Sequence, residues 1–268
     1  MLPVGVWIDR SVNKRLCSGV LFTRFVYLAR MKIALIGYGK MGRAIEEIAL
    51  AGGDEIVLKV GLENLEDFTV ENLQQAAVAI EFTDPHSAVA NIKKCFDAGV
   101  PVVCGTTGWL KELEAVKTYC NEKNGAFLCA SNFSIGVNLF FALNEYLAAL
   151  MNKHSEYEVR VEEVHHTQKK DAPSGTAISL AEQILENIKT KKSWVNSETG
   201  NAEELEILSK RIGDVPGIHA VKYNSPTDFI EITHAAYNRK GFASGALLAA
   251  KFIAGKKGIF NMKDVLGL

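Results

Sequence analysis

The sequence predicts an α/β protein with a doubly wound parallel sheet, followed by a second, α+β domain that carries an open mixed sheet. Short apolar runs alternate with amphipathic runs from residue 32 to residue 152, as in strands joined by crossover helices. A glycine-rich turn directly follows the first apolar run. After residue 152 the last three strand-like runs follow one another without a helix, which is typical of a mixed or antiparallel sheet.

Strands and helices are expected to alternate in the first half of the chain. The strands are predicted at 32–36, 55–60, 78–82, 101–104 and 126–130, and the helices at 42–51, 86–98, 109–122 and 136–152. Right-handed crossovers then place helices on both faces of the sheet. Ligands of such sheets bind beyond the carboxyl ends of the strands, so the loops there are the expected site.

The second half is expected to form four strands and one long helix before a last helix returns to the first sheet. The strands are predicted at Tyr157–Val164, Leu205–Arg211, Ile218–Tyr223 and Asp228–His234, the helices at 175–190 and Ala243–Ala254, and a polar loop at Lys191–Glu203. This order assigns 31–131 and 239–268 to the first domain and 132–238 to the second. Because an open sheet often buries its free face against another subunit, we expect an oligomer.

Residues 1–30 do not fit this pattern. They carry five basic residues and one acid, and they show no clear strand or capped helix. The simplest interpretation is an upstream start codon that adds a dispensable, non-core tail ahead of Met31. A transit peptide is the alternative, and the short apolar start gives slight support to a signal peptide.

The composition favours a globular enzyme of two domains. The 268 residues are 48% hydrophobic, with a net charge of −1. Near-neutral charge argues against a nucleic-acid partner, and no apolar run reaches the roughly 20 residues that span a bilayer. The five cysteines are odd in number and lack a CxxC pair, which favours a reducing, cytoplasmic setting over a disulfide framework.

The glycine-rich turn has the context of a dinucleotide-binding (Rossmann) motif. In the run MKIALIGYGKMGRAI, residues 31–45, a strand leads into G-x-G-x-x-G and then into an amphipathic helix. The first glycine permits a tight turn, the second lets the backbone approach a pyrophosphate, and the third lets the helix pack on the strand. The predicted cofactor-binding residues here are Gly37, Tyr38, Gly39, Lys40, Met41 and Gly42.

An acidic residue lies at the expected distance for the adenosine ribose. Glu63 follows Gly42 by 21 residues, although a solvated loop carboxylate is the alternative because three more acids follow it. Such an acid repels the 2′-phosphate of NADPH, whereas Lys40 and Arg43 offset that repulsion. The sequence therefore leaves the choice between NADH and NADPH open.

The loops after the fourth and fifth strands are expected to line the nicotinamide end of the cofactor. A Gly-Thr-Thr-Gly sequence is also ordinary turn chemistry, which is the alternative for the first of them. The predicted residues are Gly105, Thr106, Thr107, Ala130, Ser131, Asn132 and Phe133.

Residues 163–177, EVHHTQKKDAPSGTA, gather proton donors and anion-binding groups ahead of a helix. His165 and His166 can move protons near neutral pH, and Lys169 adds positive charge. The helix that opens at Gly175 and Thr176 offers free N–H groups to a carboxylate. Structural histidines are the alternative, since adjacent strand residues point to opposite faces. No metal site is predicted, because no third histidine or cysteine lies at ligand spacing nearby and HExxH is absent.

From Met31 onward the chain resembles the dihydrodipicolinate reductase family. The resemblance rests on the glycine-rich turn and on the runs CGTTG at 104–108, NFSIGVN at 132–138, residues 163–177, HAAYNR at 234–239 and GFASGA at 241–246. The chain departs from the family at Asn64, where many members carry a basic residue after the ribose acid.

The resemblance implies that NADH or NADPH reduces 4-hydroxy-tetrahydrodipicolinate, a small dicarboxylate, to tetrahydrodipicolinate on the diaminopimelate route to lysine. It also implies a cytoplasmic homotetramer. By this resemblance His165 is the proton donor or acceptor, and Lys169 is the acid that stabilises charge on the ring nitrogen. The implied substrate-carboxylate ligands are His166, Gly175, Thr176 and Arg239. Residues 132–138 and Arg239 are the expected hinges for domain closure.

Two other functions remain open from the sequence. One is another NAD(P)-dependent imine or amino-acid dehydrogenase, which would share the first domain but has no need of residues 163–177. The other is a non-catalytic dinucleotide sensor, which would need no proton donors beside its cofactor.

Overall fold

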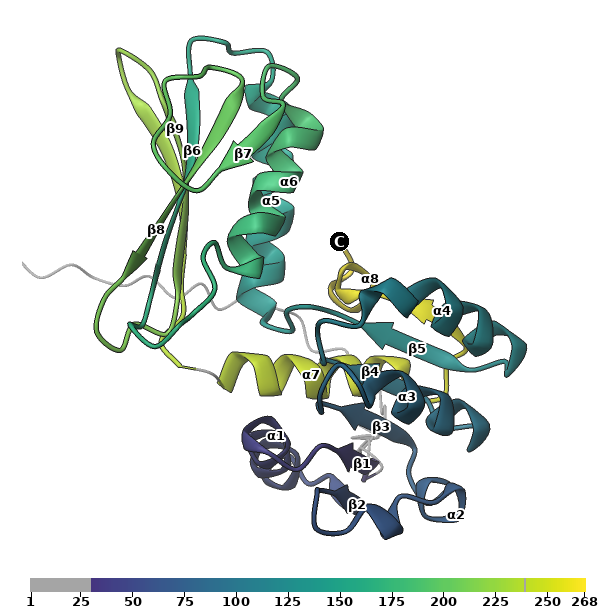
Figure 1. Ribbon diagram of the computed structural model, residues 1–268. Helices are drawn as coiled ribbons and strands as arrows, with labels where there is room; N and C mark the ends of the chain where they lie inside the picture. Colours follow the sequence, from purple (N-terminus) through teal and green to yellow (C-terminus); the bar gives the residue numbers. More distant parts are fainter. Residues whose placement is uncertain (1–29, 239) are drawn as a thin grey trace, which may run out of the picture.

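The computed structural model describes residues 30–238 and 240–268, which form two sheets with their helices (Figure 1). The predicted tail lies outside these residues, apart from Arg30. Among the described residues, no helix is long and apolar enough to cross a membrane.

The first sheet is parallel throughout, with the strand order β11-β5-β4-β3-β1-β2. Its strands are β1 (Lys32–Ile36), β2 (Glu55–Val60), β3 (Val78–Glu81), β4 (Val102–Cys104), β5 (Ala126–Cys129) and β11 (Gly258–Phe260). The central strands are buried on both faces, which explains their continuous apolar runs. The doubly wound fold is confirmed. The sequence interpretation missed β11, because three residues are too few to show a period.

Helices cover both faces of the first sheet. They are α1 (Lys40–Ala51), α2 (Val70–Leu73), α3 (Ala88–Asp97), α4 (Leu113–Glu122), α7 (Lys240–Ile253) and α8 (Met262–Leu266), with 3-10 turns at Leu65–Asp67 and Leu110–Glu112. On one face α3 and α4 pack into a core with Val102 and Phe127. On the other, α1 and α7 pack against Ile33 and Leu35. As predicted, α7 returns to the first sheet after the chain has left the second one.

The second sheet is mixed, with the strand order β10-β9-β6-β8-β7. Its strands are β6 (Glu158–His165), β7 (Ser193–Val195), β8 (Glu204–Arg211), β9 (Ile218–Asn224) and β10 (Phe229–Ala235). The helices α5 (Ile135–Met151) and α6 (Gly175–Asn187) cover one face, and the other face is open (Figure 1). The segment 191–203 was expected to be a loop, and that expectation is wrong at β7, a short edge strand held by its parallel pairing with β8.

The alternation of β6 sets the position of the polar site. Val159, Val161, Glu163 and His165 all face the helices and are buried, because residues two apart in a strand share one face. The first two fill the core with α5 and α6. The last two therefore bring a carboxylate and an imidazole into the same buried layer.

Candidate active site

The glycine-rich turn is packed too closely to admit side chains at two of its glycines. Gly37 has a φ of +96°, and a Cβ there would collide with the carbonyl oxygen of Phe82. A Cβ on Gly42 would collide with the carbonyl oxygen of Gly37. These two glycines hold α1 against the end of β1.

Gly39 differs from its neighbours because it faces open space. No described atom lies within 4 Å of the position that its Cβ would occupy. It is the N-cap of α1, and within the described chain the cap makes no side-chain hydrogen bond and the first turn carries no acid. A helix N-terminus that offers free N–H groups, with Lys40 and Arg43 in its first turn, suits an anion such as a pyrophosphate.

A cavity of about 490 Å³ opens at this end of the sheet. Its lining includes six residues that the sequence predicted for cofactor binding, Gly39, Lys40, Met41, Gly105, Thr106 and Thr107. It also includes Phe82, Thr83 and Pro85, which the sequence interpretation missed. They follow β3, so the rule that ligands bind beyond the carboxyl ends of the strands would have found them.

The loop after β2 presents Glu63 to solvent in a turn. Its neighbour Asn64 closes the loop: the side-chain oxygen accepts from the Gly61 N–H at 2.8 Å, and the amide donates to the Lys59 carbonyl at 2.7 Å. Asn64 is thus held by the loop itself. Tyr38 lies nearby with its hydroxyl bonded to Glu46, and the Arg43 guanidinium lies 5.0 Å from the centre of its ring.

The loop after β5 connects the predicted cofactor residues to the second sheet. Phe133 is buried, and its ring lies 5.8 Å from that of Phe82, so its side chain belongs to the core. Asn132 is fixed by accepting from the Ser134 N–H at 2.9 Å, and its amide donates to the Thr176 hydroxyl at 3.4 Å. This contact brings a predicted cofactor residue and a predicted substrate residue together.

The start of α6 has the features of a carboxylate site. Ser174 caps the helix, since its hydroxyl accepts from the Ala177 N–H at 3.2 Å. Gly175 is exposed, and no described atom comes within 4 Å of where its Cβ would be. The first turn of α6 holds no acid. The free N–H groups of Gly175 and Thr176 can therefore donate hydrogen bonds to a carboxylate.

Glu163 lies at the centre of a buried polar network, with no exposed surface. The Ser174 N–H donates to both of its oxygens, at 3.2 and 3.1 Å, and the Arg211 guanidinium donates at 3.2 Å. Nδ1 of His165 lies 3.4 Å away, and Nε2 of His219 lies 3.7 Å away. The remaining link is between the Ser174 hydroxyl and His219 Nε2, at 3.1 Å.

Burial decides the charge of both histidines in this network. Desolvation lowers the pKa of His165, although the Glu163 carboxylate works in the opposite direction. Desolvation lowers the pKa of His219 to about 4, and the neighbouring His165 adds to the effect. The two rings meet edge to face with their centres 4.9 Å apart. Both imidazoles are therefore neutral near pH 7 in the free protein.

Lys169 and His166 lie in the loop between β6 and α6. The Lys169 ammonium pairs with Asp171 at 2.7 Å, and Arg211 holds the same loop by donating to the carbonyls of Lys169 at 3.4 Å and Asp171 at 2.5 Å. His166 is half-buried. The predicted ligand Arg239 lies outside the described residues.

The sequence interpretation missed Arg211 and His219 and gave Glu163 no role. The first two come from β8 and β9, about 50 residues beyond β6 along the chain, so no local spacing reveals them. The sequence predicted no metal site, because no third histidine or cysteine lies near His165 and His166 in the sequence. In the structure, His219 comes from a distant strand, and Glu163, His165 and His219 place possible metal-ligand atoms within 4.8 Å of one another. Because the Arg211 guanidinium already pairs with the Glu163 carboxylate, the arrangement favours a hydrogen-bonded network over a bound divalent metal ion.

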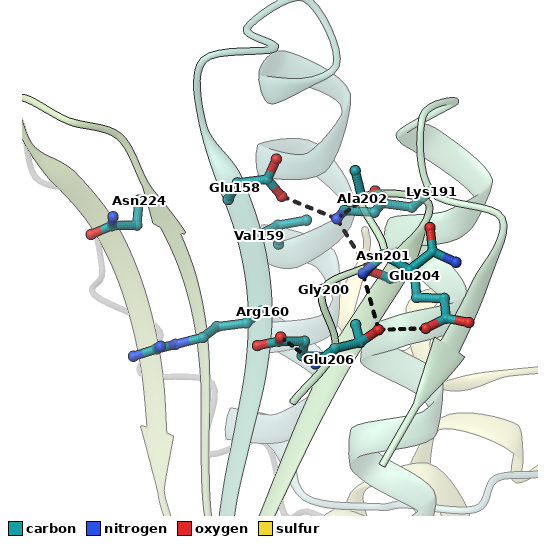
Figure 2. A pocket seen from close by; sticks show the side chains of 11 residues that line it. Glu158, Val159, Arg160, Lys191, Gly200, Asn201, Ala202, Glu204, Glu206 and Asn224 are labelled. Atoms are coloured by element: carbon teal, nitrogen blue, oxygen red, sulfur yellow. Dashed lines mark hydrogen bonds and ion pairs between the residues drawn. The ribbon is translucent and has the colours of Figure 1, made fainter. Parts of the chain in front are cut away.

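A second cavity, of about 410 Å³, lies at the opposite end of β6 (Figure 2). Lys191 reaches into it and donates to Glu158 at 3.1 Å and to the Ala202 carbonyl at 2.9 Å, while the Thr199 hydroxyl donates to Glu204 at 2.7 Å. Glu158 begins β6 and His165 ends it, so they are roughly 23 Å apart at the usual rise per strand residue. This cavity is therefore separate from the candidate active site.

A parallel sheet with an open glycine turn, next to a buried acid–base network, defines a Rossmann-type oxidoreductase. The family "Dihydrodipicolinate reductase, N-terminus" matches residues 31–133, and "Dihydrodipicolinate reductase, C-terminus" matches residues 136–266. The chain therefore belongs to the dihydrodipicolinate reductase family and is an NAD(P)H-dependent oxidoreductase. The sequence-based predictions of family, fold and cofactor class are confirmed.

Similar proteins agree with this assignment. A 4-hydroxy-tetrahydrodipicolinate reductase of Christiangramia forsetii is 49% identical over 88% of this chain and 98% of its own length. One of Methanocaldococcus jannaschii is 39% identical over 87% of this chain and 81% of its own. A solved dipicolinate-bound dihydrodipicolinate reductase from Paenisporosarcina sp. TG-14 shares the fold, with a TM-score of 0.69 at 24% identity over 87% of this chain and 97% of that chain.

Proposed function

We propose that this chain reduces 4-hydroxy-tetrahydrodipicolinate to tetrahydrodipicolinate with NADH or NADPH, in lysine and diaminopimelate biosynthesis. The observation that carries the proposal is the contact between Asn132 and Thr176, which joins the cofactor loop after β5 to the carboxylate site at the start of α6. The dinucleotide, when bound, would supply a hydride to the ring of the substrate, one proton would be added, and the 4-hydroxyl group would leave as water. The protein then has to hold two carboxylates, deliver a proton and exclude water.

The proposed roles follow the two ends of this contact. His165 exchanges a proton with the substrate, and Lys169 stabilises charge on the ring nitrogen after leaving Asp171. We assign the substrate carboxylates to His166, Gly175, Thr176 and Arg239. We assign the cofactor to Gly37, Tyr38, Gly39, Lys40, Met41, Gly42, Glu63, Gly105, Thr106, Thr107, Ala130, Ser131, Asn132 and Phe133.

The neutral state of His165 in the free protein supports this division of roles. A dianionic substrate brings negative charge next to the imidazole, which favours its protonated form. Lys169 and Arg211 lower the pKa of His165 in the free protein, and the substrate carboxylates would offset their positive charge. Binding would thus charge the proton donor as the substrate arrives.

We also propose the division at residues 131/132 and 238/239, with 132–138 and Arg239 as hinges. Asn132 and Asn138 support the first hinge, because the Asn138 amide donates to the Asn132 carbonyl at 2.9 Å and so closes the turn before α5. Domain closure about these residues would seal the site from water.

The direct test is oxidation of NADH and NADPH, followed at 340 nm, with enzymatically generated 4-hydroxy-tetrahydrodipicolinate. We expect turnover that depends on this substrate and none with acyclic 2-oxo acids plus ammonia. Turnover with the acyclic pair alone would favour an amino-acid dehydrogenase. Cofactor binding without turnover of either substrate would favour a dinucleotide sensor.

We further propose a cytoplasmic homotetramer. The open face of the second sheet supports assembly, because Phe229 on that face is 58% exposed. Cys95, Cys104, Cys120 and Cys129 are free thiols, as in a reducing compartment. Sedimentation equilibrium should give four times the chain mass, and a monomer at micromolar concentration would contradict the assembly.

A further inference from the structure

The buried network around Glu163 gives the two ring nitrogens of His165 different roles. His165 has two ring nitrogens, and they lie in different surroundings. Nδ1 is sealed from solvent and has no well-aligned hydrogen bond among the described residues, but it lies 3.4 Å from a Glu163 oxygen. Nε2 faces Gly217, where a Cβ would lie only 3.1 Å away, so the missing side chain leaves space beside it.

The carboxylate of Glu163 is held ionised in spite of its burial. Desolvation raises the pKa of Glu163, but hydrogen bonds from Ser174 and Ser209 outweigh it and the net pKa is lowered. The Arg211 guanidinium at 3.2 Å balances the negative charge. An ionised carboxylate beside an imidazole nitrogen accepts a hydrogen bond from its N–H and thereby fixes the tautomer.

We propose that Glu163 is a positioning residue for the reaction: its carboxylate holds the proton of His165 on Nδ1, so that Nε2 is the nitrogen that exchanges a proton with the substrate. This inference rests on the proposed function for the role of His165. Ser174 extends the same arrangement to the substrate, because its N–H binds Glu163 while its hydroxyl caps α6, where the substrate carboxylate would bind.

The charges around His165 give the expected effect its sign. Glu163 on the same strand and Asp171 in the following loop raise its pKa, whereas Lys169 and Arg211 lower it. His219 on β9 packs against the ring and is neutral near pH 7, because its pKa is about 4. When the Glu163 charge is removed, Asp171 is the one carboxylate of these groups that still raises the pKa of His165. Lys169 and Arg211 continue to lower that pKa. The pKa of His165 should then fall further, because a close opposite charge that favours the protonated imidazole is gone.

The kinetic test compares Glu163→Gln, Glu163→Asp and Glu162→Gln over pH 5–9. His165 donates its proton in the charged form, so activity is lost as pH rises through its pKa in the substrate complex. In Glu163→Gln this basic limb should move to lower pH, with kcat about 10- to 100-fold lower at pH 7.5 and KM for the cofactor unchanged. Glu163→Asp keeps the charge and should keep the limb.

Glu162→Gln is the matched control, since Glu162 is the next residue on β6 but points to the opposite face, where it pairs with Arg160 at 2.8 Å. Its pH profile should equal that of the unchanged protein. A fall in kcat for Glu163→Gln with an unmoved limb would assign Glu163 a purely structural role and overturn the proposal.

A second measurement does not depend on turnover. Nitrogen-15 NMR of the full chain with labelled histidine distinguishes the two tautomers, and loss of one signal in His165→Asn assigns the ring among six histidines. We expect the Nδ1–H tautomer in the unchanged protein. The Nε2–H tautomer would overturn the proposal, even if Glu163→Gln fails to fold. If the unchanged protein does not reduce the cyclic substrate, the proposed function fails, and the tautomer still decides this inference.

Discussion

The two ends of the candidate active site differ in composition: one is formed by backbone and the other by side chains. The cofactor end is a backbone surface at the carboxyl end of the strands of the first sheet, where Gly39 leaves open space and α1 offers its free N-terminus. The substrate end is a buried set of hydrogen-bonded polar groups from β6, β8, β9 and the N-cap of α6, centred on the charged Glu163. The cofactor end depends on the absence of side chains. The substrate end depends on the pairing of its side chains, and no single member of the network can replace the others.

This difference predicts different responses to mutation. A backbone surface is damaged by added atoms, which block the ligand while the fold remains. A buried ionic network is damaged by removed atoms, because each loss leaves a partner buried and unpaired. The four predictions that follow test this contrast, beginning with the largest expected effect.

Removal of the acid–base groups should have the largest effect. In His165→Ala and Lys169→Ala we expect kcat to fall by about 10²–10⁴, the usual contribution of a positioned acid or base, while cofactor affinity stays near normal. Steady-state kinetics and cofactor fluorescence titration measure the two quantities. His154→Ala and Lys170→Ala are controls, because His154 pairs with Glu156 at the surface and Lys170 is exposed. Normal rates in both active-site variants would rule out the proposed mechanism.

An added methyl group should damage the cofactor end without unfolding it. Gly39→Ala places a Cβ in space that no described residue fills, so the melting temperature should hold while dinucleotide affinity falls roughly tenfold or more. Gly200→Ala is the matched control, since its Cβ also meets no described atom within 4 Å but lies far from α1. Unchanged affinity in Gly39→Ala would show that the dinucleotide does not approach this turn.

Loss of one hydroxyl at the substrate end should have a smaller effect. Thr176→Val removes a single hydrogen-bonding group and keeps the N–H groups of α6, so we expect KM for the substrate to rise about two- to tenfold with little change in kcat. Thr118→Val removes a hydroxyl that donates to the Glu114 carbonyl on the exposed side of α4 and should leave KM unchanged. A large fall in kcat would instead place Thr176 in the chemical step.

The smallest difference is expected between the two cofactors. Glu63 faces solvent at the ribose position and Asn64 is held by its own loop, so NADH should serve at least as well as NADPH in kcat/KM. Glu63→Gln should shift the ratio toward NADPH. A hundredfold preference of the unchanged protein for NADPH would mean that Lys40 and Arg43 dominate the field at this position.

The local character of the cofactor end explains why it was accessible to prediction. A strand, a glycine turn and a helix follow one another within 20 residues, and the steric need for glycine at position 37 leaves a visible mark in the sequence. Phe82, Thr83 and Pro85 were missed although the strand at 78–82 was predicted, because the rule that ligands bind beyond the carboxyl ends of strands was not applied to that strand. By contrast, β7 and β11 are three residues each and owe their existence to pairing with β8 and β5.

The sequence by itself determined the alternation of strands and helices, the glycine turn and the family to which the chain belongs. Each depends on periods or motifs that span a few residues. Only the tertiary structure decided that Arg211 and His219 meet Glu163 and that Asn132 meets Thr176. These contacts join residues about 40 to 60 positions apart, and they form because sheet pairing and burial, rather than local spacing, bring their strands and helices together.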